Sequence, residues 1–392
     1  MNRIVVVGAS LAAVHAVEAL RTHGYEGEIT LVGAEPHLPY DRPPLSKEAL
    51  RSGPELDGLL LREPGWYGDQ GVELRLGRAA AGLDVRQRQL LLEGGCELAY
   101  DGLVIATGCT PRSLGDLDET GPVHVVRSLA DAAALHAELV PGRHLVVIGA
   151  GFIGLEVAAT ARQMGLDVSV VETAPVPLTR VLGDRVGGWF RDHHKANGVD
   201  LYLGSALDRI EVTEGGTKVR LGDGTTLAAD VVVAGIGVAP ATGWLDGSGV
   251  EVSDGVVCDQ SLRTSVPGVV AAGDVARWHH PLFDETMRVE QWRNAAEQGG
   301  RAALSLLGET EAFAALPYFW SDQFDATARF VGVASGARQI EVRQTGDRSM
   351  VALFGRDDVI RGALCINAPR LLVRYQKAIL GQVPWGDVAE SG

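Results

Sequence analysis

The chain has 392 residues and a formal net charge of −15, with 46% hydrophobic and 22% charged residues. A single compact core rarely grows to this length, so two or three domains are expected. The acidic balance argues against a nucleic-acid partner, and no apolar run reaches the ~18 residues that a membrane helix needs. The cysteines lie far apart without a CxxC pair, so we expect no disulfide framework, no metal site and a cytoplasmic location; they are Cys96, Cys109, Cys258 and Cys365.

The chain opens with a strand, a turn and a helix, "IVVVGASLAAVHAVEAL", and then a second strand, "EITLVGAE". This order is typical of a dinucleotide-binding turn, in which three glycines follow the pattern G-x-G-x-x-G. Gly8 keeps the first glycine, whereas Ser10 and Ala13 replace the other two. The ribose-binding acid is expected at Glu35, two places past the strand. The segment predicts a degenerate nucleotide site.

A later buried strand, within "YDGLVIATGCTPR", ends in Ala106, Thr107 and Gly108. A glycine at the end of such a strand leaves room for a flat ring, because it has no Cβ.

The segment "VVIGAGFIGLEVAATARQMGLDVSVVE" contains the complete pattern at Gly149, Gly151 and Gly154. The first glycine makes the tight turn, the second lets the backbone approach a pyrophosphate, and the third lets the helix pack on the strand. Glu172 ends the next strand 23 positions after Gly149, close to the spacing of about 20 expected for a ribose-binding acid. A carboxylate there repels a 2′-phosphate and favours NADH, although Arg180 offers a contact to the phosphate of NADPH. An ordinary glycine-rich loop is the alternative interpretation.

Two further phrases complete the pattern. "VPGVVAAGDVAR" is a buried strand that ends in Gly273 and Asp274, an acid placed to hold polyol hydroxyls. "VEQWRNAAEQGGRAAL" predicts an amphipathic helix with Glu290 and Gln291 at its start. The N-terminus of a helix stabilises negative charge, which suits the pyrimidine edge of a reduced flavin.

With "LPYDRPPLSK" and "YFWSDQFD" added, the chain resembles the NADH-dependent ferredoxin reductases of bacterial oxygenase systems. The wider group includes putidaredoxin reductase, rubredoxin reductase and apoptosis-inducing factor, and the resemblance covers essentially the whole chain. It implies that hydride passes from NADH to FAD and that single electrons then leave for a two-iron ferredoxin that feeds an oxygenase.

The resemblance also implies the cofactor contacts. The residues expected at FAD are Gly8, Ser10, Ala13, Glu35, Arg42, Lys47, Ala106, Thr107, Gly108, Arg127, Gly273, Asp274, Glu290, Gln291, Trp292 and Trp320. The residues expected at NADH are Gly149, Gly151, Phe152, Ile153, Gly154, Glu156, Glu172, Arg180 and Gly237. Lys47 and Glu156 are expected to pair at the reacting rings, with Trp320 near the flavin. A solvated lysine, a surface acid and a core tryptophan are the alternatives.

The implied fold is α/β, with two Rossmann-like dinucleotide-binding domains of the glutathione-reductase type and a C-terminal α+β interface domain. The FAD domain is expected to be discontinuous, at residues 1–112 and 243–314, because "AAGDV" belongs to the same site as the first turn. The NADH domain, 113–242, is inserted into it. Residues 315–392 contain short alternating strands and a helix, and form the interface domain.

A disulfide reductase or an NADH oxidase on this fold would need a redox cysteine facing the flavin. The absence of any cysteine before Cys96 weakens that alternative, and Cys109 is interpreted as structural. A rubredoxin or a nitrite-reductase-type partner stays open, as does a non-enzymatic NADH-sensing flavoprotein.

Partner recognition rests on surface detail. Six arginines are candidates for a basic cluster that binds an acidic ferredoxin, and scattered solvated arginines are the alternative; they are Arg293, Arg301, Arg329, Arg361, Arg370 and Arg374. His193 and His194 are interpreted as solvated helix residues. Whether the protein is a monomer or a homodimer is undecided.

Overall fold

The computed structural model describes residues 1–115, 123–213 and 216–389. The chain divides into two compact units, each assembled from three segments. The first unit consists of Met1–Asp41, Leu56–Thr110 and Ala239–Tyr318. The second unit consists of Arg42–Glu55, Pro111–Val238 and Phe319–Gly392. The three domains with boundaries at 112, 242 and 314 stay a prediction.

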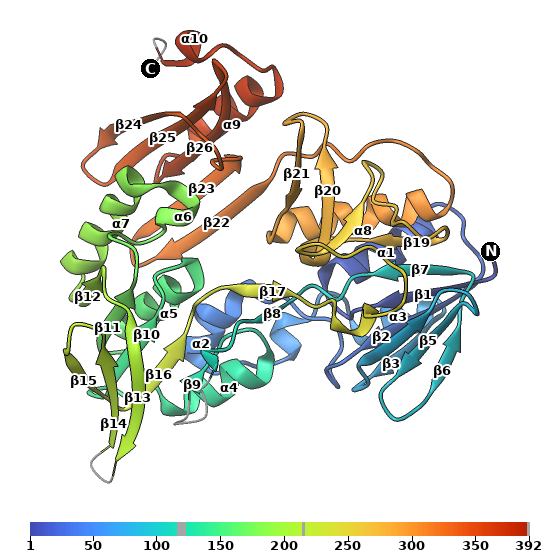
Figure 1. Ribbon diagram of the computed structural model, residues 1–392, viewed down its shortest axis with the longest axis horizontal. Coiled ribbons are helices and arrows are strands. Elements are labelled where there is room, and N and C mark those ends of the chain that lie inside the picture. The colour runs from blue at the N-terminus through green and yellow to red at the C-terminus, as the bar shows by residue number, and fades with distance from the viewer. Residues whose placement is uncertain (116–122, 214–215, 390–392) are drawn as a thin grey trace. The chain divides into compact units, whose positions relative to one another are not determined.

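The first unit is built on a parallel five-stranded sheet in the order β19-β7-β1-β2-β3 (Figure 1). Its strands are β1 (Arg3–Val7), β2 (Glu28–Gly33), β3 (Val72–Leu76), β7 (Gly102–Ile105) and β19 (Val269–Ala271). The central strands are uninterrupted apolar runs because both faces of the sheet are buried. Two helices, α1 (Leu11–Thr22) and α8 (Trp292–Leu306), pack against each other in the same core.

Smaller elements complete this unit. One antiparallel sheet consists of β4 (Ala80–Asp84), β5 (Gln89–Leu92) and β6 (Glu97–Ala99), and a second small sheet of β18 (Val256–Cys258), β20 (Ala276–His280) and β21 (Glu285–Arg288). The short helices are α3 (Pro64–Asp69) and the 3-10 turns η2 (Asp57–Leu59), η4 (Gly243–Leu245) and η5 (Gly273–Val275).

The second unit contains another parallel sheet, in the order β12-β11-β10-β16-β9 (Figure 1). Its strands are β9 (Val123–His124), β10 (His144–Ile148), β11 (Asp167–Glu172), β12 (Val199–Leu203) and β16 (Val231–Ala234). An antiparallel sheet of β13 (Leu207–Thr213), β14 (Gly216–Leu221) and β15 (Thr226–Ala229) lies between β12 and β16 in the sequence. The helices are η1 (Pro43–Ser46), α2 (Glu48–Ser52), α4 (Leu129–Glu138), α5 (Phe152–Gln163), α6 (Thr179–Leu182) and α7 (Asp184–Ala196).

The C-terminal part of the second unit is a five-stranded sheet in the order β22-β23-β26-β25-β24, with β23 to β26 antiparallel (Figure 1). Its strands are β22 (Tyr318–Gln323), β23 (Ala326–Gly332), β24 (Gln339–Gly346), β25 (Ser349–Arg356) and β26 (Val359–Ile366), followed by α9 (Pro369–Leu380) and α10 (Trp385–Ala389). Phe330, Phe354 and Leu364 share one apolar core with the buried face of α5. The C-terminal sheet and α5 therefore stabilise each other.

Two short strands, β8 (Cys109–Pro111) and β17 (Val238–Pro240), lie where the chain passes from one unit to the other. Among the helices of the described residues, none is both long enough and apolar enough to cross a membrane.

Candidate functional site

The first glycine turn follows β1 in the first unit. Gly8 has φ +115°, and its N–H donates to the carbonyl of Val32 at 2.8 Å. A Cβ at Gly8 would lie 2.1 Å from the carbonyl oxygen of Ala106. Ser10 begins α1 as its N-cap, yet its hydroxyl makes no capping bond within the described residues. The first N–H groups of a helix without a side-chain cap are available to an anion such as a phosphate.

The acid and the strand end expected beside this turn lie in the same unit. Glu35 is half-buried and accepts a 2.5 Å hydrogen bond from the hydroxyl of the buried Tyr40. Thr107 donates through Oγ1 to the carbonyl of Ala241 at 2.9 Å, and Gly108 has φ +66°. The Thr107 bond fixes the turn that the sequence assigns to the flavin ring.

The turn at Gly273 also belongs to the first unit. Gly273 has φ +78°, and its N–H donates to Oε1 of Gln298 at 2.9 Å. A Cβ at Gly299 would lie 2.1 Å from the carbonyl oxygen of Ala12. Helices α1 and α8 therefore pack backbone to backbone. Because β1, β7 and β19 are parallel, their carboxyl ends lie along one edge of the unit, together with the first turn of α1.

The start of α8 carries buried polar atoms that have no hydrogen-bond partner within the described residues. These atoms are Oε1 of Gln291, Oδ1 of Asn294 and Nε2 of Gln298. Buried polar groups are almost always hydrogen-bonded in a native protein. Three unsatisfied atoms beside two glycine turns therefore fit a polar cofactor such as FAD. The sequence analysis did not identify Asn294 and Gln298, which are four residues apart on the buried side of α8.

Two residues expected at FAD from this helix region already have protein partners. Glu290 accepts a 2.6 Å hydrogen bond from Arg288, and Trp292 donates through Nε1 to Asp41 at 2.7 Å. Cys109 is buried, with Sγ 3.3 Å from Nη1 of Arg288 and 3.4 Å from the carbonyl oxygen of Asp274. The cysteine thus belongs to the packing around Asp274.

The second glycine turn, in the second unit, joins β10 to α5. Gly149 has φ +100°, and a Cβ there would lie 2.5 Å from the carbonyl oxygen of Gly235. A Cβ at Gly154 would lie 2.3 Å from the carbonyl oxygen of Gly149. Gly151 is the N-cap of α5, and Ile153 in its first turn is 46% exposed. A turn of this shape offers backbone N–H groups to a pyrophosphate.

The carboxylate of Glu172 lies against this turn. Its Oε2 accepts from the N–H of Ala150 at 2.8 Å, and its Oε1 accepts from the N–H of Ala174 at 2.9 Å. Gly237 has φ +96°, and a Cβ there would lie 3.6 Å from Nη2 of Arg180. The structure therefore gathers the acid, the arginine and the glycines expected at NADH in one unit.

Lys47 and Glu156 are in contact in the second unit. Nζ of Lys47 lies 2.7 Å from Oε2 of Glu156, whose side chain is only 3% exposed. Ser46 donates to the same oxygen at 2.6 Å, and Ser321 donates to Oε1 at 2.6 Å. Thr160 donates to the carbonyl of Ser46 at 2.9 Å. Ser46, Thr160 and Ser321 were missed from the sequence, because nothing local indicates that their hydroxyls meet a buried carboxylate.

Arg42, Arg127 and Trp320, which are also expected at FAD, lie in the second unit. Nη1 of Arg42 donates to the carbonyl of Arg127 at 2.6 Å. Trp320 is partly buried on β22, next to Ser321. Phe152 and Phe319 make an edge-on ring contact at 4.6 Å between centroids, which packs β22 on the start of α5.

The interpretation of His193 and His194 as solvated helix residues was wrong. The side chain of His193 is only 13% exposed and stacks on Trp189. His194 is fully buried, and its Nε2 lies 2.8 Å from Oε1 of Gln323. Burial lowers the pKa of His194 to about 4. The sequence of α7 alone does not reveal this burial, because Gln323 and Phe324, which contact the imidazole, lie more than 120 residues further along the chain.

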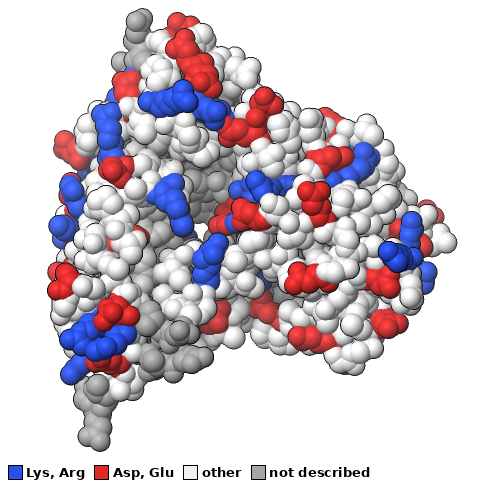
Figure 2. Space-filling model, viewed as in Figure 1, with Lys and Arg blue, Asp and Glu red and all other residues white. Residues whose placement is uncertain are grey.

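Two of the six arginines proposed as a basic cluster are not surface cations. Arg361 is buried on β26, and Arg301 forms ion pairs with Glu309 at 3.2 Å and with Glu311 at 3.1 Å. On the face drawn in Figure 2, the Lys and Arg side chains are interspersed with Asp and Glu. The paired and buried arginines therefore have structural roles.

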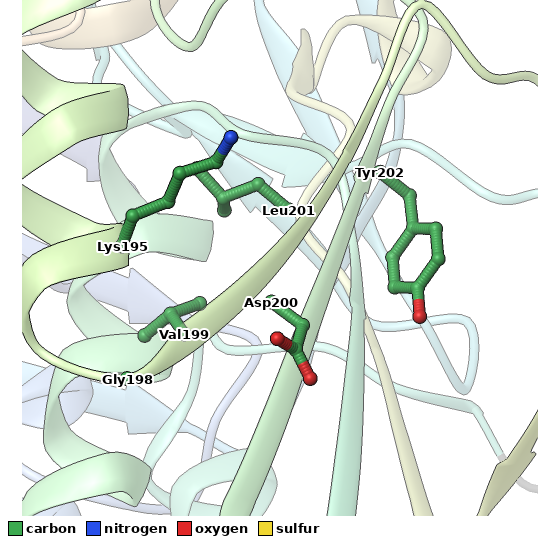
Figure 3. Close-up of a pocket in the computed structure, with 6 residues that line it drawn as sticks. All are labelled: Lys195, Gly198, Val199, Asp200, Leu201 and Tyr202. Carbon is green, nitrogen blue, oxygen red and sulfur yellow. The ribbon is translucent and has the colours of Figure 1, made fainter.

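A surface hollow of about 460 Å³ lies between the end of α7 and β12. Figure 3 shows its lining residues, Lys195, Gly198, Val199, Asp200, Leu201 and Tyr202. None of them is a residue expected at either nucleotide.

Comparisons with known proteins agree over almost the whole chain. The family described as pyridine nucleotide-disulphide oxidoreductase matches residues 2–299, and the reductase C-terminal family matches residues 318–387. The ferredoxin–NAD(+) reductase component of the anthranilate 1,2-dioxygenase system of Burkholderia cepacia is 38% identical, over 93% of this chain and 91% of that protein. Putidaredoxin reductase of Pseudomonas putida is 37% identical, over 98% of this chain and 93% of that protein.

A solved structure is similar to the same extent. The covalent putidaredoxin reductase–putidaredoxin complex matches with a TM-score of 0.93 and 34% identity, and the match covers 98% of this chain and 94% of that chain.

Proposed function

This chain belongs to the pyridine nucleotide-disulphide oxidoreductase family, and from that premise we propose that it is an FAD-dependent NADH:ferredoxin reductase that supplies electrons to an oxygenase. The fold class and the family resemblance predicted from the sequence are confirmed. The observation that carries the proposal is the pair of glycine turns, each at the carboxyl edge of its own parallel sheet, in a chain whose relatives are ferredoxin reductases.

When bound, FAD accepts two electrons from NADH and releases them one at a time, which is the chemistry that links a nicotinamide to a one-electron carrier. In the first unit we assign its binding to the residues around the first glycine turn, the end of β7 and the start of α8. They are Gly8, Ser10, Ala13, Glu35, Ala106, Thr107, Gly108, Gly273, Asp274, Glu290, Gln291 and Trp292. By resemblance, Arg42, Lys47, Arg127 and Trp320 of the second unit also belong to the FAD site.

NADH is assigned to the second turn, with Phe152 and Ile153 at the start of α5. Glu172 supports a preference for NADH, because its carboxylate lies against the turn at Ala150 and would accept ribose hydroxyls while repelling a 2′-phosphate. Arg180, beside Gly237, is the residue that would favour NADPH. The fixed position of Glu172 carries the assignment to NADH.

The catalytic proposal concerns Lys47 and Glu156. The carboxylate holds Nζ of Lys47 at 2.7 Å, so the ammonium group has one orientation rather than several. A fixed cation stabilises the negative charge that develops on the cofactor without reorganising during the reaction. By resemblance, Glu156 would contact the nicotinamide, and Trp320 on β22 would contact the flavin.

A cysteine-based reaction has little support. Burial raises the pKa of Cys258 to about 12 and that of Cys365 to about 12, so neither provides a thiolate at neutral pH. Cys109 is held by Arg288 and the carbonyl of Asp274. The four cysteines occur as thiols, which supports the proposal that the protein works in the reducing cytoplasm.

The electron acceptor is proposed to be a two-iron ferredoxin, because the relatives are named as ferredoxin reductase components and as putidaredoxin reductase. Steady-state turnover distinguishes this function from a non-enzymatic NADH sensor. The purified holoenzyme should reduce ferricyanide and a two-iron ferredoxin through many cycles. A reduced flavin–nicotinamide complex that persists in the presence of both acceptors would contradict the assignment as a reductase.

A further inference from the structure

A continuous line of hydrogen bonds in the second unit runs from Lys47 to His194. Nζ of Lys47 donates to Glu156, and Ser321 donates to the other carboxylate oxygen at 2.6 Å. Nε2 of Gln323 donates to Oγ of Ser321 at 3.0 Å, and Oε1 of Gln323 lies 2.8 Å from Nε2 of His194. Glu156, Ser321, Gln323 and His194 are all buried.

The direction of every bond in this line follows from the carboxylate. A carboxylate only accepts, so the hydroxyl proton of Ser321 is directed at Glu156. Ser321 must then accept from the amide nitrogen of Gln323, which leaves the amide oxygen facing His194. That oxygen requires a proton on Nε2 of the imidazole. The low pKa of His194, caused by burial, keeps the ring neutral in this tautomer.

The two oxygens of Glu156 have separate partners. Oε2 receives Lys47 and Ser46, whereas Oε1 receives Ser321. Without the Ser321 hydroxyl, Oε1 would be a buried charged oxygen without that donor, and the carboxyl group would rotate to share the donors on Oε2. The geometry of Lys47 therefore depends on β22.

We propose that Ser321 and Gln323 are positioning residues for the Lys47–Glu156 pair, which they hold in one orientation through the ordered line that ends at His194. The proposal rests on the catalytic role assigned above to Lys47 and Glu156. It gives the C-terminal sheet a function in the chemistry of the nicotinamide site, besides carrying Trp320.

A double-mutant cycle tests the positioning role. The rate constant for flavin reduction by saturating NADH is measured anaerobically in the holoenzyme for the wild type, Ser321→Ala, Glu156→Gln and the double variant. Ser321→Ala is expected to slow reduction about tenfold with little change in the apparent Kd for NADH. The double variant should be no slower than Glu156→Gln, because both changes remove the same interaction.

Two further variants separate positioning from packing. Ser321→Thr keeps the hydroxyl and should restore the rate to within about twofold of the wild type. Ser169→Ala removes an equally buried hydroxyl, which lies 2.9 Å from His144 on another strand, and should leave the rate unchanged. Two results would overturn the proposal. One is a double variant whose rate loss equals the product of the two single losses. The other is a loss in Ser321→Ala that is no larger than the loss in Ser169→Ala.

A spectroscopic readout is independent of turnover. In holoenzyme with ¹⁵N-labelled histidine, the His194 resonances are assigned by their loss in His194→Gln. We expect a neutral ring with the proton on Nε2 at neutral pH, and loss of that single tautomer in Gln323→Leu. A proton on Nδ1, or a charged ring, would contradict the ordered line. If NADH fails to reduce the wild-type flavin, the proposed function fails, and the tautomer alone then decides whether the line exists.

Discussion

Replacement of Gly154 by alanine should damage the NADH site and leave the FAD site intact. The added Cβ would lie 2.3 Å from the carbonyl oxygen of Gly149, whereas ordinary contact begins at 3.4 Å. Helix α5 or the glycine turn must therefore move by roughly 1 Å, and overpacking of this kind costs about 1–3 kcal/mol. Because the dinucleotide rests on that turn, the cost should appear in its affinity as a loss of about 5- to 150-fold.

The assay is the NADH dependence of the anaerobic flavin-reduction rate, which gives an apparent Kd, together with the flavin content of the purified variant. Gly188→Ala is the matched control, since Gly188 is also helical and a Cβ there meets no atom within 4 Å. An unchanged Kd in Gly154→Ala, or a loss of bound flavin instead of NADH affinity, would refute the reasoning.

Three other predictions use the same turns and the buried histidine. Gly8→Ala should be purified largely without flavin, as seen in its absorption spectrum, because its φ is +115° and the new Cβ would lie 2.1 Å from the carbonyl oxygen of Ala106; full flavin content would contradict this. Glu172→Gln should raise the kcat/KM ratio of NADPH to NADH about tenfold by removing a charge while keeping an acceptor for Ala150; steady-state kinetics with both coenzymes check it. The pKa of His194 falls from 6.5 when unfolded to about 4 when buried, so the unfolded chain binds the extra proton. Burial of the neutral His194 ring contributes about 3 kcal/mol to the free energy of unfolding, and this contribution should be lost as the pH falls from 6.5 towards 4. Urea unfolding of the wild type and His194→Gln over that range should show the variant to be less pH-dependent.

The two glycine turns could be predicted from the sequence because their determinants are local. Gly149, Gly151, Gly154 and Glu172 stand within one strand–helix–strand unit, and each is indicated by local backbone geometry or by the spacing of the acid from the turn. The degenerate first turn was recognisable for the same reason, since Gly8 remains at the position where φ must be positive.

The polar network around Glu156 could not be predicted in the same way. Ser46 and Ser321 are separated from Glu156 by 110 and 165 residues, and each looks like an ordinary hydroxyl in its own segment. His194 was misjudged because a polar residue in a helix gives no sign of which strand will cover it. Asn294 and Gln298 were overlooked because most residues on the same face of α8 are alanines and glycines. That composition indicates a helix that packs closely, so two buried amides are not expected there.

The central claim is that one glycine turn binds FAD and the other binds NADH as its reductant. An anaerobic titration of the holoenzyme, first with NADH and then in a separate sample with NADPH, tests it most directly through the visible absorption of the flavin. The account predicts complete bleaching at one equivalent of NADH and much slower bleaching by NADPH. A protein purified without flavin, or a flavin that neither coenzyme bleaches, would contradict it.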